Sequence, residues 1–157
     1  MLSVNSDSFF YQLGRNRVVV ATASAWLIAQ VLKVIFGLIR AKKFDFRWLM
    51  RSGGMPSSHV ALSMCLACSI GLYYGFDSGL FAVTMAFAAI TMFDAQGIRQ
   101  HSGKQAMILN KILEDIYENK GVQENRLKEL MGHTPVEVYA GGALGLLVAI
   151  LFYRGTA

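Results

Sequence analysis

Charged residues are scarce in this chain. Only 16% of its 157 residues are Asp, Glu, Lys or Arg, whereas 54% are hydrophobic and the mean hydropathy is +0.41. Average soluble domains carry about 25% charged residues, so this composition excludes an ordinary soluble protein. Internal repeats, low-complexity tracts and a second domain are absent from the sequence. We therefore expect an all-α integral membrane protein with a single membrane domain over residues 1–157.

Other absences narrow the class further. The chain has two cysteines, Cys65 and Cys68, and both lie at helical spacing within an apolar stretch, which favours packing over a metal or redox Cys-x-x-C site. Basic runs interleaved with surface aromatics are missing, which argues against nucleic-acid binding. The first fifteen residues contain no signal-peptide cleavage pattern, so we expect the first apolar stretch to be retained.

Four apolar stretches are each close to the ~20 residues with which a helix crosses the hydrocarbon core. They cover residues 18–39, 59–76, 79–95 and 136–153 and predict four transmembrane helices. This arrangement puts the connections 40–51 and 97–133 on one side of the membrane, and both termini with the 73–78 turn on the other.

The charge distribution orients this bundle. The two long connections carry eleven Lys and Arg residues, whereas the opposite side carries only Arg15, Arg17 and Arg154. The eleven are Arg40, Lys42, Lys43, Arg47, Arg51, Arg99, Lys104, Lys111, Lys120, Arg126 and Lys128. The positive-inside rule places the connections in the cytoplasm and predicts a plasma (inner) membrane protein with both termini outside. A net charge of +5 and a pI of about 9.4 fit an anionic membrane surface and an anionic substrate.

The longer connection contains a predicted helical segment over residues 105–131. Apolar residues recur at spacings of three and four between Gln105 and Asn119, which is typical of an amphipathic helix, and Glu124 to Met131 predict a short second helix. We expect the amphipathic helix to lie on the membrane face or to cover the end of the bundle. A lid that gates a substrate is the alternative.

The second and fourth apolar stretches begin in a similar way. Residues 53–59 read Gly-Gly-Met-Pro-Ser-Ser-His, and residues 133–137 read His-Thr-Pro-Val-Glu. In both, proline is predicted at the first helical position, where unpaired N–H groups and the helix dipole favour an anion. Two such helix starts, each with a histidine, predict phosphate chemistry.

Charged residues and histidines lie at the ends of all four stretches, always on the side of the long connections. They are Lys33, Arg40, His59, Asp94, Arg99, His133 and Glu137. Charged side chains at membrane depth are costly, so they usually face the bundle interior, pair with one another and mark a functional site. The sequence therefore predicts one site formed by four helix ends.

These residues resemble the motifs of the type 2 phosphatidic acid phosphatase and vanadium-dependent haloperoxidase superfamily. Lys33 and Arg40 keep the spacing of its first motif, with Ala41 in place of a proline. Residues 56–59 keep its second motif, with serine in place of glycine. The resemblance implies a helical membrane phosphatase that needs no metal and no other cofactor.

The third motif is less complete. His133 and Glu137 keep its spacing with Glu in place of Asp, whereas Leu127 occupies the position of its arginine.

The chain more closely resembles a divergent, haloperoxidase-related branch of small membrane proteins over residues 30–145. The shared segments are Gly-Gly-Met-Pro-Ser-Ser-His at 53–59, Phe-Asp-Ala-x-Gly-x-Arg at 93–99 and Leu-Lys-Glu-Leu-x-Gly-His-x-Pro-x-Glu-Val at 127–138.

The resemblance and the chemistry of phosphate ester hydrolysis assign roles. His133 is predicted to be the nucleophile that forms a phosphohistidine, Glu137 to orient its ring, and His59 to protonate the leaving alkoxide. Cations and hydroxyls are expected around the phosphate. They are Lys33, Arg40, Ser57, Ser58, Arg99 and Lys128, with Lys42 as an alternative to Arg40 and Asp94 as a supporting ion-pair partner of Arg99 or Lys33.

Most of these residues also have a structural interpretation. Thr134 to Glu137 matches a capping box, so Glu137 could satisfy the N-cap amide instead of orienting a histidine. Ser57 and Ser58 could be capping hydroxyls. Other structural roles are snorkelling for Lys33 and Arg40, a structural ion pair for Asp94 with Arg99, and helix packing for Gly141, Gly142 and Gly145.

The residues leave two functions open. The first is a metal-independent lipid phosphate phosphatase with a site that faces the cytoplasm, acting on phosphatidylglycerophosphate, phosphatidic acid or a polyprenyl diphosphate, in that order of preference. The second is a non-catalytic lipid-headgroup or anion-binding protein, or a transport component, which Leu127 and Ala41 favour. A metal-dependent alcohol phosphotransferase would need several aspartates grouped together, and Asp94 is the single one in its segment. Four membrane spans favour a lipid substrate, which argues against a vanadium peroxidase. The sequence leaves the oligomeric state open, and a homo-oligomer is one of the alternatives.

Overall fold

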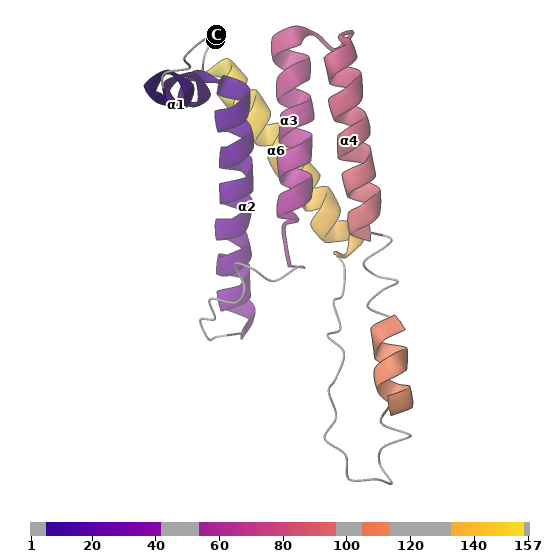
Figure 1. Cartoon of the computed structure of the whole chain (residues 1–157). Helices are drawn as coiled ribbons and strands as arrows, with labels where there is room; N and C mark the ends of the chain where they lie inside the picture. Colours follow the sequence, from indigo (N-terminus) through magenta and orange to yellow (C-terminus); the bar gives the residue numbers. More distant parts are fainter. Residues whose placement is uncertain (1–5, 42–53, 97–104, 114–132, 156–157) are drawn as a thin grey trace.

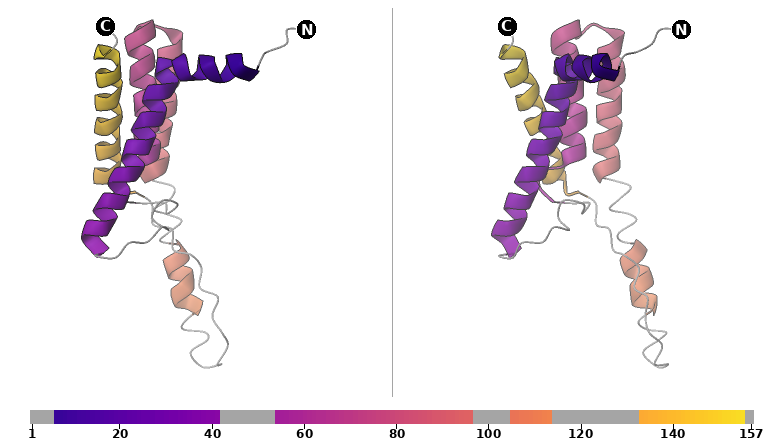
Figure 2. Two further views of the ribbon diagram at one scale, coloured as in Figure 1. Left: turned by 90° about the vertical axis from the view of Figure 1, so that its left-hand side faces the viewer. Right: turned by 60° about the vertical axis from the view of Figure 1, so that its left-hand side comes forward.

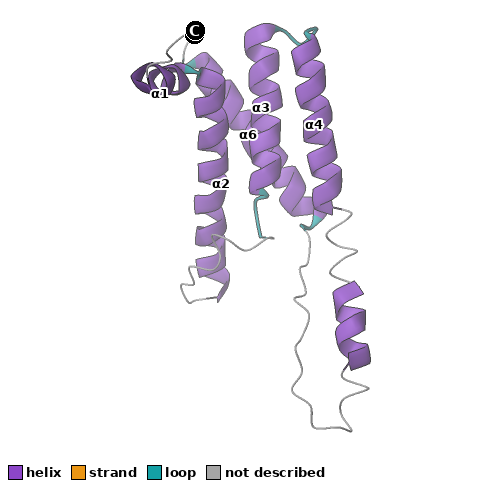
Figure 3. Cartoon of the chain, viewed as in Figure 1, coloured by secondary structure: helices purple, strands orange, loops and turns teal. Residues whose placement is uncertain are grey.

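The computed structural model describes residues 6–41, 54–96, 105–113 and 133–155, and within them the chain is helical apart from short loops and turns (Figures 1 and 3). The helices are α1 (Ser6–Arg15), α2 (Arg17–Ala41), α3 (Ser58–Tyr74), α4 (Gly79–Gln96) and α6 (Pro135–Arg154). A further helical segment covers residues 105–113. The predicted all-α class is confirmed.

Three of the described helices are long and apolar enough to cross a membrane. They are Arg17–Ile39 within α2, Gly79–Gln96 and Pro135–Arg154. The helix α3 is also apolar but has 17 residues, or about 25 Å at 1.5 Å per residue, which is shorter than the ~30 Å hydrocarbon core. The structure therefore supports a membrane protein, and α3 as a fourth span stays a prediction.

The helix α3 lies at the centre of the bundle. It packs against α2, α4 and α6, and α6 runs obliquely behind it, from the side of α2 to the lower end of α4 (Figure 1). Cys65 and Cys68 are buried in a core cluster formed with α2 and α6. Both cysteines thus have the packing role that their apolar surroundings predict.

Glycines allow α3 and α6 to approach closely. A Cβ atom at Gly141 would stand 2.5 Å from the carbonyl oxygen of Ser57, and one at Gly145 would overlap the carbonyl oxygen of Ala61. Both glycines are buried in α6. The helices meet at backbone distance because side chains are missing there, so the predicted packing role of these glycines is confirmed.

The turn between α3 and α4 sets the length of α3. Gly75 has a φ of +92°, a left-handed conformation that glycine adopts without steric cost, and its N–H donates to the carbonyl oxygen of Gly71 at 3.0 Å. The Oγ of Ser78 then accepts the N–H of Phe81 at 3.2 Å. The helix predicted to reach residue 76 therefore ends at Tyr74.

Two helical segments lie outside the main bundle. The helix α1, which was not predicted from the sequence, runs across the bundle axis at the end where the C-terminus lies (Figure 2). Residues 105–113 form the described part of the predicted 105–119 amphipathic helix, and they extend away from the bundle end instead of covering it (Figure 1). The remainder of the predicted segment, 114–131, lies outside the described residues.

Candidate functional site

The start of α6 is a complete capping box. The Oγ1 of Thr134 accepts the N–H of Glu137 at 3.4 Å, and the Oε2 of Glu137 accepts the N–H of Thr134 at 2.9 Å. Pro135 occupies the first turn, as predicted. The structure thus forms the capping interaction that the sequence left open as the alternative role of Glu137.

His133 precedes this cap and is held in the interior. Its side chain is 1% exposed, and its backbone N–H donates to the carbonyl oxygen of Ala95, the penultimate residue of α4, at 3.2 Å. The capping box and the bond to α4 together fix the peptide groups on both sides of His133. The chain therefore presents this imidazole from a constrained position between α4 and α6.

The start of α3 differs from the prediction in one respect. Ser57 is the N-cap, with extended backbone angles, so Pro56 precedes the cap and does not occupy the first helical position. The prediction for Pro56 was wrong because the N–H of Ser57 is used elsewhere: it donates to the carbonyl oxygen of Glu137 in α6 at 2.9 Å. This bond joins the two helix starts directly.

The hydroxyl of Ser57 does not act as a helix cap. Ser57 is fully buried, and its Oγ has no hydrogen-bond partner among the described residues. A buried hydroxyl without a partner costs about 1–3 kcal/mol, so its retention calls for an explanation. The interpretation of Ser57 as an ordinary capping hydroxyl is therefore not supported by the geometry.

Lys33 enters the same region from α2. Its side chain is 7% exposed, and its Nζ donates to the Oγ of Ser58 at 3.5 Å. Gly54, with a φ of +97°, lies against the aliphatic stem, and a Cβ there would stand 3.2 Å from the Cγ of Lys33. Lys33 therefore points into the bundle, and the snorkelling alternative is wrong for this residue.

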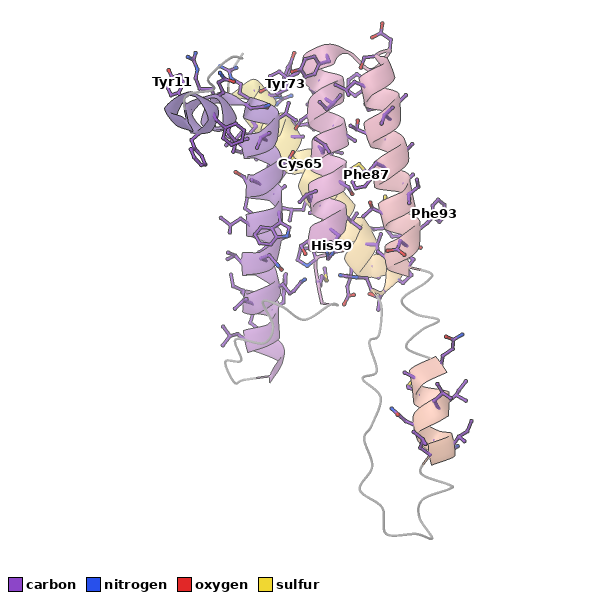
Figure 4. The ribbon with its side chains drawn as sticks, in the orientation of Figure 1. Tyr11, His59, Cys65, Tyr73, Phe87 and Phe93 are labelled. Carbon is purple, nitrogen blue, oxygen red and sulfur yellow. The ribbon has the colours of Figure 1, made fainter. Side chains whose placement is uncertain are left out.

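A cavity of about 250 Å³ lies between the ends of α3, α4 and α6. His59, Asp94 and His133 supply its ionisable groups, and Figure 4 shows His59 at the end of α3 nearest this site. The remaining wall comes mainly from one face of α4 and consists of Phe87, Ile90, Thr91 and Ala95. These wall residues were not predicted from the sequence, although their spacing of three and four with Asp94 is the signal of one helical face.

The remaining predicted site residues are only partly visible. Arg40 lies in the last turn of α2, and its side chain is outside the described residues. Four further residues lie wholly outside the described ranges: Lys42, Arg99, Leu127 and Lys128. Asp94 is half-buried at the cavity, whereas its predicted pairing with Arg99 stays a prediction.

The described residues at this end of the bundle suit an oxyanion better than a metal ion. They supply one buried ammonium, two buried hydroxyls and two imidazoles, which bind or exchange protons with phosphate oxygens, together with the carboxylate of Asp94 at the cavity. Within the described ranges, no group of three or more His, Cys, Asp or Glu is placed to hold a metal ion. The imidazoles and the carboxylate of Asp94 line the cavity, whereas the ammonium of Lys33 meets the hydroxyl of Ser58 at the start of α3.

Comparison with known proteins identifies the family. The model of the family described as "Divergent PAP2 family" matches residues 14–148. The chain belongs to the divergent PAP2 family. The "Uncharacterized membrane protein YuiD" of Bacillus subtilis (strain 168) is 40% identical over 153 residues, which cover 89% of this chain and 96% of that protein. No solved structure matches the chain.

Membership in the divergent PAP2 family confirms the predicted relation to type 2 phosphatidic acid phosphatases at family level. The match spans both helix starts that form the cavity, together with Lys33 and Asp94. The narrower relation to haloperoxidases stays a prediction from the motifs.

Proposed function

We propose that this divergent PAP2 protein is a metal-independent membrane phosphatase that hydrolyses a lipid phosphate through a phosphohistidine. One observation carries the proposal: His59 and His133, which are 74 positions apart in the chain, line the same cavity at the end of the bundle. Family membership supports phosphatase chemistry in general terms. The substrate and the individual roles below are our inference from the geometry and chemistry of the residues.

Phosphate binding relies on the start of α3 and on Lys33. The ammonium of Lys33 and the hydroxyl of Ser58 are already within 3.5 Å of each other, so one phosphate oxygen can contact both. The hydroxyl of Ser57 would donate to a second oxygen and gain the partner that it lacks among the described residues. These donors act in an interior with a low dielectric constant, which strengthens each charge-assisted bond.

Arg40, Arg99 and Lys128 would complete the phosphate site from the neighbouring connections, as their motifs imply. Asp94 would hold Arg99 or Lys33 by an ion pair. These contacts are assigned from the sequence, because the side chains of these basic residues lie outside the described ranges. The same is true of Lys42, the alternative to Arg40.

The chemistry divides between the two histidines. A ring nitrogen of His133 attacks phosphorus, the bond from phosphorus to the lipid oxygen breaks, and protonated His59 transfers its proton to that oxygen. Neutral His59 then takes a proton from water, which attacks the phosphohistidine and releases inorganic phosphate. His59 is exposed and His133 is buried, so the leaving lipid and the water would approach from the side of His59.

Glu137 is a positioning residue in this scheme. Its carboxylate accepts the N–H of Thr134, the amide bonded directly to His133. Its carbonyl oxygen accepts the N–H of Ser57. Glu137 therefore connects the proposed nucleophile with the proposed phosphate site through backbone groups, in addition to the ring contact that the motif implies.

The lipid part of the substrate fits the wall of the cavity formed by α4. Phe87 and Ile90 line the cavity and are also 52% and 67% exposed, so the wall continues onto the outer, membrane-facing surface of that helix. Together with the charge asymmetry, this favours an inner-leaflet lipid phosphate, with phosphatidylglycerophosphate first, then phosphatidic acid and polyprenyl diphosphate. The site then faces the cytoplasm.

The decisive experiment measures phosphate release from these three lipids by purified protein in detergent with EDTA. We expect release by the wild type, inhibition by vanadate, and a loss of several orders of magnitude in His133→Ala. The third histidine of the chain, His101, provides a matched control, because His101→Ala should retain wild-type activity. Activity in His133→Ala, or complete loss with EDTA, would contradict the mechanism.

A second function is favoured by one specific observation. Glu137 uses its carboxylate in the capping box, which leaves less support for orienting the ring of His133. A protein that binds a lipid phosphate without cleaving it would need only Lys33, Ser57 and Ser58. The same panel separates the two functions, since binding without phosphate release in the wild type would support the non-catalytic one.

A further inference from the structure

A second and larger hollow, of about 540 Å³, lies at the opposite end of the bundle. It forms where α1, the first turn of α2 and the last turn of α3 meet. Six of its lining residues are Tyr11, Arg15, Asn16, Arg17, Tyr73 and Tyr74. Figure 4 shows Tyr11 on α1 and Tyr73 at the end of α3, both at this end of the molecule. The proposed phosphatase mechanism uses none of these residues.

The joint between α1 and α2 gives this hollow a defined shape. Asn16 is the single residue between the two helices, and its N–H donates to the carbonyl oxygens of Gln12 and Leu13 at 3.1 and 3.2 Å. Its Oδ1 accepts the N–H of Val19 at 3.2 Å. The residue therefore ends one helix and caps the next, which holds α1 across the bundle axis.

The hollow is positively charged. Arg15 lies with its guanidinium 5.4 Å from the ring centre of Tyr11 and donates to the hydroxyl of Tyr11 at 3.1 Å. Arg17 follows two residues later, and no Asp or Glu is among the described residues that line the hollow. A lining with two guanidinium groups favours an anionic ligand, and guanidinium matches phosphate geometry especially well.

The surroundings of the hollow are those of a membrane interface. On α1, Phe9 and Phe10 are 53% and 71% exposed, and Tyr74 at the end of α3 is 61% exposed. Aromatic residues gather at the level of lipid headgroups, and a helix that lies across the bundle axis with exposed apolar residues is suited to that layer. A membrane interface that follows α1 would put the two arginines at headgroup depth.

We propose that this hollow is a binding site for the phosphate-bearing headgroup of a membrane phospholipid, in the leaflet that surrounds the two chain termini. Arg15 and Arg17 bind the phosphate, Tyr73 and Tyr74 line the headgroup, and the aromatic residues of α1 lie beside the acyl chains. A free phosphate ion would use the arginines but would gain nothing from Phe9 and Phe10. The site is separate from the histidine cavity, and the proposal does not depend on the phosphatase function.

The test is calorimetric titration of the purified protein in detergent with a short-chain phosphatidylglycerol. A parallel titration of Lys33→Met, which removes the ammonium proposed to bind phosphate at the other end of the bundle, separates any binding there. We expect saturable binding that Arg15→Gln combined with Arg17→Gln weakens about tenfold or more, because charge-assisted bonds to phosphate are lost. Arg154→Gln is the matched control: this arginine is exposed at the same end but does not line the hollow, so its removal should leave affinity unchanged.

Two results would overturn the proposal. Equal losses in Arg154→Gln and in the double variant would show general surface charge instead of a site. Inorganic phosphate binding as tightly as the lipid, with the same sensitivity to Arg15 and Arg17, would show a soluble-anion site. If the double variant does not fold, Tyr74→Ala provides the second test, because this exposed side chain should weaken lipid binding about threefold; unchanged affinity would then contradict the proposal.

Discussion

Two adjacent glycines of α6 provide a sharp test of the packing that holds the histidine cavity together. A Cβ at Gly141 would stand 2.5 Å from the carbonyl oxygen of Ser57 and 3.3 Å from its Cβ. At Gly142 the nearest atoms would be the Cγ1 of Val60 at 3.9 Å and the Cε of Met64 at 4.0 Å. Gly141→Ala and Gly142→Ala thus make the same chemical change at neighbouring positions with opposite steric consequences.

The expected magnitude follows from the atoms involved. The atom opposite Gly141 is a backbone oxygen that accepts the N–H of Ala61 at 3.0 Å, so it cannot rotate away as a side chain would. Overpacking of this kind costs about 1–3 kcal/mol, and the higher helix propensity of alanine returns about 0.5–1 kcal/mol. We expect Gly141→Ala to lower the free energy of unfolding by about 0.5–2 kcal/mol, and Gly142→Ala to leave it unchanged or slightly raised.

The assay is unfolding in mixed detergent micelles, followed by the fluorescence of the two tryptophans. Activity supplies an independent reading, because Gly141→Ala displaces Ser57 and its bond to Glu137. Phosphate release should therefore fall in Gly141→Ala at temperatures where the protein is still folded, and persist in Gly142→Ala. Equal stability of the two variants would refute the close contact between α3 and α6.

Three further predictions concern the polar groups at the site. Ser57→Ala removes a buried hydroxyl that lacks a partner among the described residues, so the free energy of unfolding should rise by about 1–3 kcal/mol while vanadate inhibition weakens about fivefold to tenfold. Lys33→Met should fold and weaken vanadate inhibition at least tenfold, whereas Lys33→Arg should retain part of it, since the charge beside Ser58 is kept. Thr134→Ala should cost about 1 kcal/mol of unfolding free energy through loss of the cap, and Glu137→Gln should cost less because an amide oxygen can still accept the N–H of Thr134. Equal unfolding energies for wild type and Thr134→Ala would contradict the capping role.

Burial of the charged Lys33 side chain lowers the stability of the folded protein. Insertion scales give about 2.5–3.5 kcal/mol for a lysine at the centre of a membrane helix, and Lys33, which lies nearer the end of its span, costs less than this. Here the hydroxyl of Ser58 is 3.5 Å away, and the carboxylate of Glu137 adds a favourable electrostatic interaction. This cost is consistent with a residue that serves ligand binding, because a phosphate would offset it further.

Local composition determined most of the helical layout. The predicted stretches 18–39, 59–76, 79–95 and 136–153 agree within two residues with α2, α3, α4 and α6. Hydropathy depends on each segment alone, so the long apolar runs identify these helices without knowledge of their neighbours. The capping box at Thr134 and the small-residue face of α6 were also readable, because both depend on short-range spacing.

Short-range patterns were insufficient elsewhere. The helix α1 was missed because it is short and only amphipathic. Pro56 was placed two positions too far into α3, because the N–H of Ser57 bonds to Glu137 in another helix. The apolar wall on α4 was missed because its residues carry no charge that would mark a site.

The sequence by itself determined that this is a helical membrane protein whose charged residues and histidines gather at one set of helix ends. Only the tertiary structure decided which of them meet: His59 and His133 at one cavity, Lys33 at Ser58, and Ser57 at Glu137. It also placed two arginines beside tyrosines at the opposite end. The reason is physical: helix formation follows local residue patterns, whereas contacts between helices depend on which small residues let two backbones approach.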